Sequence, residues 1–443
     1  MPANDSAALI VARFLKTNNY TQSFEAFIQE AGLSEDAGDV TSSGLTLERL
    51  LEEKRLYDQS ANFEKLNLSS DDNDQGWATS APSSAHVIET LPSRTNVLNV
   101  LVDAAADSNQ ARLIASTSDR RINIIDLPAK TLSASWSDVQ DAPVLSQLLL
   151  RGKYHVSASM SGSLVMADVE SGKTIVRRKD HTKYIVDLAP YDAAESLLLA
   201  SAGWDNVVNI YTLDVAESLT CELLTSIKLP TKPESILFAK HPLSNQPILV
   251  LTRTDSSHLF FYSAEKDSVM LGQQNLAPHS NAWVAFTPAS IALCPADGST
   301  IAAATNSTPH MKLLIVRLLF PTVEGRAVTT PQTPREVALA QQARADREHE
   351  AIKLHCNTMS TQTPYSTPLV VWRPNGKGVW VNSDDGIIRG IDILSGKVVS
   401  ELKGHENGSK VRTLWAGNTS EQSETAERLV SGGFDHKLVL WTP

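Results

Sequence analysis

The fold is decided by the stretch Leu429-Val-Ser-Gly-Gly-Phe-Asp-His-Lys-Leu-Val-Leu-Trp-Thr-Pro443, with which the sequence ends. It contains a short apolar run, two glycines followed by Phe434 and Asp435, and a second apolar run that ends at Trp441. Glycine and aspartate between two apolar runs are typical of tight turns. The stretch therefore predicts two short β-strands joined by a turn that carries Asp435.

Looser copies of this strand, turn and strand recur upstream. In the clearest copy, residues 198–205 lead to residues 207–211, and Asp205 again stands in the expected turn. The other pairs of strands are residues 113–119 with 122–126, 155–162 with 164–168, 248–255 with 259–262, 301–306 with 312–316, and 378–385 with 387–392. Together with the final stretch, the chain contains seven such units.

The final stretch resembles the end of a WD repeat, which is the unit of a β-propeller blade. Because seven is the usual number of such units, the resemblance implies a mostly β, seven-bladed propeller over residues 86–443. Only Thr442 and Pro443 follow Trp441, so the last blade needs a fourth strand from elsewhere. We expect residues 86–91 to supply that strand and to close the ring.

The resemblance also implies a set of four hydrogen-bonded side chains within a blade. In such a set the Asp of the turn accepts a hydrogen bond from a His, the His bonds a Ser, and the Ser bonds an aromatic residue, which satisfies polar groups buried between strands. The two sets that match are His405, Ser431, Asp435 and Trp441, and His181, Ser201, Asp205 and Tyr211. These residues are interpreted as structural and not as catalytic triads.

Residues 1–33 predict a helical hairpin. Leu9, Ile10, Phe14 and Leu15 recur at helical spacing, Asn18-Asn19 suits a helix end, and a second helix is expected from near Thr21 to Gly32. With Tyr20, Ser23, Phe27 and Glu30 they resemble the LisH motif, although Asn19 and Phe24 replace the usual Gly and Ala. The resemblance implies a homodimer formed through Leu9, Ile10, Phe14, Leu15, Tyr20, Phe24 and Phe27. The alternative is that the hairpin docks on the chain's own propeller.

Three further segments complete the predicted organisation. Residues 34–68 are expected to form a turn and an amphipathic helix over 46–66, which either joins the dimer or covers the propeller. Residues 69–85, rich in Ser, Asp and Pro, predict a flexible linker. An insertion at 318–353 contains a helix-forming stretch flanked by prolines, and it is either a solvated excursion or a partner-binding element.

Composition restricts the class of protein. The 443 residues carry a formal net charge of −11, which argues against nucleic acid as a partner, and basic clusters such as residues 177–179 are small. The three cysteines, Cys221, Cys294 and Cys356, lie far apart, so neither a disulfide framework nor a zinc site is expected. Neither a secretory signal nor an apolar run long enough to span a membrane is evident. We expect a protein of the cytosol or nucleus.

Motifs of enzymes are missing from the sequence. It contains no nucleophile elbow, phosphate-binding loop or zinc-protease motif, so neither catalytic residues, a metal site nor a cofactor is expected. Trp204 and Phe434 stand directly before the Asp of a turn, where a side chain can point into solvent. An exposed aromatic residue among polar ones is a candidate anchor for a partner protein. The alternative is that both rings lie flat on neighbouring loops.

The resemblance implies a non-catalytic adaptor that dimerises through its LisH segment and holds partner proteins on a propeller face. Complexes of the ubiquitin-ligase, corepressor or cytoskeletal-motor type use this architecture. One alternative is a nuclear RNA- or ribosome-assembly factor with a local basic face. A more remote alternative is an enzyme that uses the propeller channel.

Overall fold

The computed structural model describes residues 7–39, 46–47, 77, 80–104, 111–193, 196–216, 218–278, 286–321, 334–421 and 424–443. The chain divides into two compact units, Met1–Gln75 and Gly76–Pro443. Apart from its first two residues, the predicted helix over 46–66 lies outside the described residues.

The N-terminal unit is a helical hairpin of α1 (Ala7–Thr17) and α2 (Thr21–Ala31), followed by the short 3₁₀ helix η1 (Glu35–Gly38). Asn19 and Gly32 adopt the left-handed backbone conformation, with φ angles of 58° and 65°, directly after the two helices. The amide of Gly32 bonds the carbonyl of Ile28, which caps α2. The predicted hairpin, including both helix ends, is confirmed.

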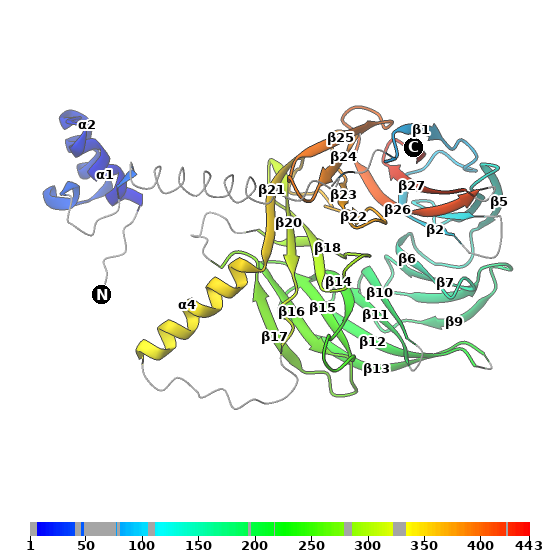
Figure 1. The fold of residues 1–443 in the computed structure, drawn as a ribbon. Helices are drawn as coiled ribbons and strands as arrows, with labels where there is room; N and C mark the ends of the chain where they lie inside the picture. Colours follow the sequence, from blue (N-terminus) through cyan, green and yellow to red (C-terminus); the bar gives the residue numbers. More distant parts are fainter. Residues whose placement is uncertain are drawn as a thin grey trace. The chain divides into compact units, whose positions relative to one another are not determined.

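Within the described residues of the second unit, the strands form seven four-stranded sheets, and Figure 1 shows these sheets arranged in a ring. The first three blades consist of β2 (Val97–Asp103), β3 (Arg112–Thr117), β4 (Ile122–Asp126) and β5 (Thr131–Trp136); β6 (Val144–Leu150), β7 (Tyr154–Ser159), β8 (Leu164–Asp168) and β9 (Thr174–Arg178); and β10 (Ile185–Ala193), β11 (Ser196–Gly203), β12 (Val207–Asp214) and β13 (Thr220–Lys228).

The other four blades follow the same order. They consist of β14 (Pro233–Lys240), β15 (Pro247–Arg253), β16 (His258–Ser263) and β17 (Met270–Asn275); β18 (Pro288–Leu293), β19 (Thr300–Thr305), β20 (His310–Arg317) and β21 (Ile352–Thr361); β22 (Val370–Trp372), β23 (Gly378–Val381), β24 (Ile387–Asp392) and β25 (Val398–Lys403); and β26 (Val411–Glu421), β27 (Glu424–Gly433), β28 (Leu438–Thr442) and β1 (Ser84–Val87). The seven-bladed propeller predicted from the sequence is therefore confirmed.

The last blade closes the ring with a strand from the N-terminal side of the propeller. β1 pairs antiparallel with β28, so that His86 lies opposite Leu440 and Val87 opposite Val439. The strand lies at 84–87 and not at the predicted 86–91. The shift has a physical reason: the chain must cross from this outer strand to the innermost strand of the first blade, which begins at Val97.

Burial explains why the second and third strands of each blade could be predicted from the sequence. Every side chain of β7 is buried, because the second and third strands of a blade have neighbouring blades on both faces. The outer strand β9 alternates between half-buried and exposed side chains. Strands of the first kind have few charged side chains and often read as apolar runs, as β8 (Leu164–Asp168) does, whereas strands of the second kind alternate.

Two parts of the predicted linker over 69–85 belong to the propeller. Trp77 and Ala81 pack against the apolar cluster between the sixth and seventh blades. The strand β1 then begins at Ser84. The propeller unit consequently begins at Gly76, before the predicted boundary at residue 86.

The insertion between β20 and β21 contains helix α4 (Pro334–Glu350), which covers the stretch predicted to be helical and projects from the ring in Figure 1. Arg344 anchors it through a hydrogen bond to the carbonyl of Gln273 on β17, and its guanidinium also bonds Glu348 one turn later in the same helix. Glu348 is buried, whereas Val337 and Leu339 nearer the start of the helix are exposed. The helix is thus held to the propeller near its C-terminal end.

Candidate protein-interaction surface

The structure brings the four expected residues of the last blade together. The Nδ1 atom of His405 lies 3.0 Å from both carboxylate oxygens of Asp435, and its Nε2 atom lies 2.8 Å from the hydroxyl of Ser431. The indole of Trp441 donates to the same hydroxyl at 2.9 Å. Burial opposes ionisation of Asp435, but its bond to His405 and the amides of Glu406 and Lys437 outweigh burial and lower its pKa to about 2.

The third blade repeats three of the four contacts. His181 lies 3.0 Å from Asp205 through Nδ1 and 2.8 Å from the hydroxyl of Ser201 through Nε2. Tyr211 is fully buried, but its hydroxyl makes no hydrogen bond to any described residue. Burial raises the pKa of this hydroxyl. The predicted substitution of Tyr for Trp therefore preserves an aromatic ring in the core without the fourth hydrogen bond.

Other blades hold the turn aspartate differently. In the first blade, Asp119 accepts hydrogen bonds of 2.6 Å from Ser93 and from Thr117. In the sixth blade, Arg389 reaches Asp385 at 2.8 Å, so a cation replaces the histidine. An aspartate in the turn between the second and third strands therefore forms polar contacts with its surroundings even in blades that lack the histidine.

These turns lie beside the loops that lead into the first strands of the blades. The amide of Trp204 bonds the carbonyl of Tyr184, and the amide of Phe434 bonds that of Lys410. The same contact joins Thr254 to Lys232. We call the surface formed by these turns and loops the turn face.

Trp204 is 39% exposed on the turn face. Its ring stacks on Tyr184, with 5.5 Å between centroids and 22° between planes. The ammonium of Lys232 lies 4.7 Å from the centroid of Trp204. The indole therefore contacts neighbouring loops, as expected from the alternative that the ring lies flat on them. It still exposes part of its surface to solvent, together with the equally exposed Tyr184.

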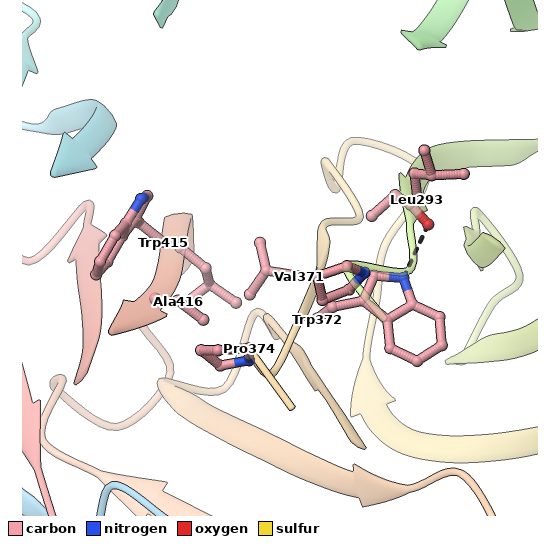
Figure 2. Close-up of a pocket in the computed structure, with 10 residues that line it drawn as sticks. Leu293, Val371, Trp372, Pro374, Trp415 and Ala416 are labelled. Carbon is pink, nitrogen blue, oxygen red and sulfur yellow. Dashed lines mark hydrogen bonds between the residues drawn. The ribbon is translucent and has the colours of Figure 1, made fainter. Parts of the chain in front are cut away.

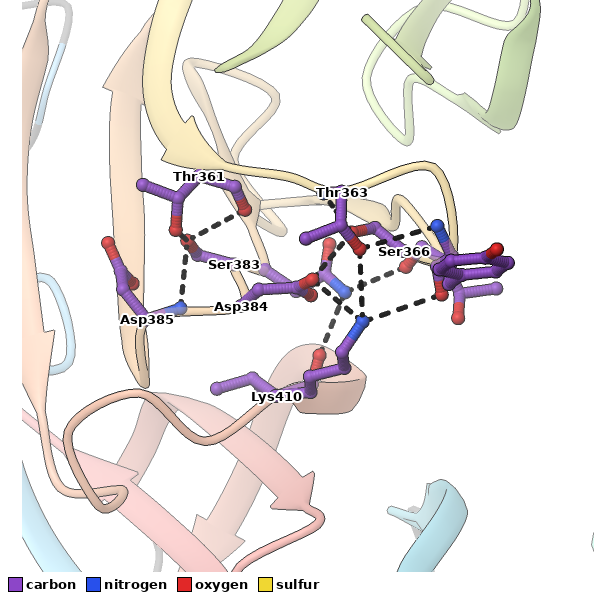
Figure 3. A network of polar contacts seen from close by, with 11 residues as sticks. Thr361, Thr363, Ser366, Ser383, Asp384, Asp385 and Lys410 are labelled. Atoms are coloured by element: carbon purple, nitrogen blue, oxygen red, sulfur yellow. Dashed lines mark hydrogen bonds and ion pairs between the residues drawn. The ribbon is translucent and has the colours of Figure 1, made fainter. Parts of the chain in front are cut away.

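Phe434, 40% exposed on the same face, lies next to a polar network that includes Lys410. Figure 3 shows the centre of that network, where Lys410 forms an ion pair of 2.8 Å with Asp384. Ser366 donates to the same carboxylate at 2.6 Å, and its hydroxyl also accepts from the amide of Thr363. The loop held in this way presents Tyr365 with 89% of its surface exposed.

The first strands carry a further set of side chains next to the turn face. In six of the seven described blades, the register between the first and second strands shifts near the start of the first strand, which re-aims the side chains there. Three of the residues at these shifts are acidic or basic, namely Asp187, Glu234 and Arg412. Burial raises the pKa of Glu234 to about 7 and lowers the pKa of Arg412, and neither forms an ion pair with a described residue.

The far ends of three first strands surround an apolar cavity of about 440 Å³. Figure 2 shows Val371 and Pro374 of one blade opposite Ala416 of the next, where the ring of Trp415 points away from them, with Leu293 on the third blade. The indole of Trp372 donates to the carbonyl of Ala292 and so fixes two of these blades together. Because its lining is almost entirely apolar, the cavity has few groups that could orient a ligand.

The residues expected at a dimer interface have different environments in the hairpin. Leu9, Ile10, Phe14, Leu15 and Phe27 are half-buried, and Tyr20 is 52% exposed. Phe24 instead lies in the core of the hairpin itself with Ala12 and Ile28, so its ring is covered by its own chain. The larger Phe in place of the usual Ala is therefore accommodated within one chain.

Several residues of the turn face were not found from the sequence. Tyr184, Lys232, Tyr365 and Lys410 lie in loops without apolar periodicity, and only the hydrogen bonds between loops and turns bring them beside Trp204 and Phe434. The cysteines Cys221, Cys294 and Cys356 form no disulfide with one another. In the part of the chain that the structure describes, no group of three or more His, Cys, Asp or Glu side chains could hold a metal ion.

Comparison with protein families gives two matches. Residues 73–442 match the model described as UCP007778, beta-propeller domain, and residues 6–34 match UCP007778, LisH domain. The chain belongs to the UCP007778 family. The first match begins before Trp77, in agreement with the extent of the propeller unit. No curated protein matches the chain. Among the described residues, no helix is both long and apolar enough to cross a membrane.

Both domains are of kinds that typically mediate protein interactions without catalysis. The combination of a LisH hairpin with a seven-bladed propeller therefore points to protein interaction as the general activity of this family member.

Proposed function

We propose that this protein is a non-catalytic scaffold that dimerises through its LisH hairpin and holds partner proteins on the turn face of its propeller. Such a scaffold would serve a multiprotein complex of the ubiquitin-ligase, corepressor or cytoskeletal-motor type, in the cytoplasm or nucleus. The observation that carries the proposal is the exposed stack of Tyr184 and Trp204 beside Lys232. Exposed aromatic residues next to cations are typical anchors of protein interfaces.

The charges of the turn face favour an acidic partner segment. Lys183 and Lys232 are exposed on either side of the aromatic stack. Two acids lie nearby: Glu234, whose pKa burial raises to about 7 so that it is partly neutral at physiological pH, and the exposed Asp255 in the adjacent turn. Arg412 at the start of β26 has no ionic partner among the described residues, but it is not exposed and burial lowers its pKa, so it adds little to the charge of this face. An acidic peptide with an apolar or aromatic side chain matches this combination.

Dimerisation is supported by the small core of the hairpin. Among the described residues, its buried apolar cluster consists of Ala12, Phe24 and Ile28, while Val11 and Tyr20 expose 41% and 52% of their surfaces. A core of this size rarely stabilises a fold alone. A second hairpin packed on the half-buried apolar residues of α1 would enlarge it.

The partner surface is tested with Trp204→Ala combined with Phe434→Ala in the full chain. Affinity purification from the native source, read by mass spectrometry, should lose specific proteins while the melting temperature stays unchanged. Leu243→Ala is the matched control, because Leu243 is 85% exposed but lies in the loop between β14 and β15, at the opposite end of the strands. Retention of every partner by the double variant would refute the role of the turn face. Recovery of RNA in place of proteins would favour the assembly-factor alternative.

The dimer is tested by sedimentation of the full chain. Ile10→Asp with Phe14→Asp should convert a dimer to a monomer, because two buried carboxylates in an apolar interface are costly. Gln22→Asp adds a charge at an exposed position of α2 and should leave the dimer intact. A wild-type chain that sediments as a monomer at all concentrations would exclude dimerisation.

A further inference from the structure

Trp77 occupies a slot between the sixth and seventh blades of the propeller. Its ring meets Trp380 of β23 edge to face, with 5.1 Å between centroids and 75° between planes. The guanidinium carbon of Arg373 lies 4.3 Å from the centroid of the Trp77 ring. The indole is therefore held by one aromatic and one cationic contact, both with distances typical of specific interactions.

Two glycines make room for this ring. A Cβ atom at Gly378 or at Gly390 would lie 2.5 Å from the indole of Trp77, which is closer than any real side chain approaches. Gly378 does not adopt a left-handed conformation, so its backbone alone would tolerate alanine. The approach of the indole is the feature that requires glycine there.

Arg373 is held in place by contacts that do not involve Trp77. Its side chain is fully buried and forms a two-pronged ion pair with Glu427 of β27, with nitrogen–oxygen distances of 2.6 and 2.9 Å. This pair joins the sixth blade to the seventh. A cation immobilised in this way presents a ready surface to an aromatic ring, since little side-chain entropy remains to be lost.

The neighbouring strand β1 has few contacts of its own. All four of its side chains are exposed, so its pairing with β28 rests on backbone hydrogen bonds and one contact of 3.4 Å between His86 and the hydroxyl of Thr442. Apolar burial occurs on either side of it, at Trp77 before the strand and at Ile88 after it, which is 3% exposed. Trp77 and Ile88 thus hold a strand that its own side chains do not anchor.

We propose that the slot lined by Arg373, Gly378, Trp380 and Gly390 is an indole-binding site, and that Trp77 is its resident ligand. By filling the site, Trp77 fastens the N-terminal segment to the propeller at a second point and protects the closing strand β1. The chemical class that the site accepts is an indole ring, free or as a tryptophan side chain.

The test uses the full chain with Trp77→Ala and free indole as the probe. The variant should melt at a lower temperature than the wild type, and indole should bind it and restore part of the loss. Wild type should not bind indole, because the slot is filled. Trp204→Ala is the control, since it removes an exposed indole elsewhere and should create no such site. If indole does not bind the Trp77→Ala variant, the proposal of an indole-binding site is wrong.

Hydrogen exchange distinguishes occupation of the indole-binding site from protection of the strand β1. In Trp77→Ala, the amides of β1 should exchange at least about tenfold faster than in wild type. Indole should not restore this protection, because the free ring is not attached to the chain. Unchanged exchange in β1 would overturn the fastening role. Gly378→Ala keeps Trp77 but blocks the slot, so it should accelerate exchange in β1 as well, and normal protection in this variant would likewise contradict the proposal.

Discussion

At the scale of the residue, Asp435 connects three segments of the last blade. Its carboxylate bonds the ring of His405 and the amides of Glu406 and Lys437. The pKa of about 2 lies below the value of an unfolded chain, so ionised Asp435 stabilises the fold. This stabilisation is complete at pH values above the unfolded pKa and is lost as the pH falls through the folded pKa.

The replacement Asp435→Ala tests this assignment. We expect the free energy of unfolding at pH 7 to fall by about 2–4 kcal/mol, because the buried His405 also loses its partner. Urea denaturation at pH 7 and at pH 3 should show a smaller difference from wild type at the lower pH. Asp267→Ala, at an exposed position, is the control. Equal stability of Asp435→Ala and wild type would contradict the structural role.

The aromatic positions of the two sets should respond differently. Tyr211→Phe removes a buried hydroxyl without a hydrogen bond to any described residue, so we expect unchanged or slightly higher stability, within about 1 kcal/mol. Trp441→Phe loses the bond to Ser431 and buried volume, and should cost about 2–4 kcal/mol. Thermal unfolding of both variants measures the contrast. A loss above about 1 kcal/mol in Tyr211→Phe would show that the hydroxyl is bonded.

The resemblance to the WD repeat made both sets predictable, because it assigns the His, Ser and Asp their places in a blade. The missing bond of Tyr211 was not predictable, since it depends on the distance that a phenol reaches in a packed core. The sequence also did not predict that Arg389 takes the place of a histidine, and the reason is related. Arg389 lies within the third strand of its blade, where the sequence gives no sign that it reaches back to Asp385.

At the scale of the element, the second and third strands of each blade could be predicted, whereas the first and fourth could not. The pairs differ in burial: β8 reads as an apolar run and the side chains of β7 are buried and mostly small or apolar, but β9 alternates and carries Arg177 and Arg178. Helix α4 was predictable from helix propensity and flanking prolines alone. Its anchoring through Arg344 depends on β17, which lies far from it in sequence.

The closing strand β1 offers a direct test of backbone pairing. His86→Pro removes an amide from the ladder with β28, and we expect a loss of about 3 kcal/mol in unfolding free energy. His86→Ala should change stability by less than about 0.5 kcal/mol, since the His86 side chain is exposed. Chemical denaturation of both variants compares them. Equal stability of the two would mean that β1 contributes nothing to closing the ring.

At the scale of the whole molecule, the sequence predicted a LisH segment followed by a closed seven-bladed ring, because the repeats and the incomplete last blade required a returning strand. It did not predict that Trp77, which precedes the strand β1, packs against the propeller. Serine and aspartate surround Trp77 in the sequence, and nothing local distinguishes it from a linker residue. Its role becomes visible only beside Gly378 and Gly390, some 300 residues later in the chain.

The division into two units predicts two unfolding transitions. If the hairpin is held by a second copy, its transition should rise in temperature with protein concentration, because dissociation accompanies unfolding. The propeller transition should not depend on concentration, since its ring closes within one chain. Differential scanning calorimetry over a hundredfold range of concentration measures both. Ile10→Asp with Phe14→Asp should abolish the concentration dependence and leave the propeller transition in place, whereas a propeller transition that shifts in parallel would place the dimer contact on the ring.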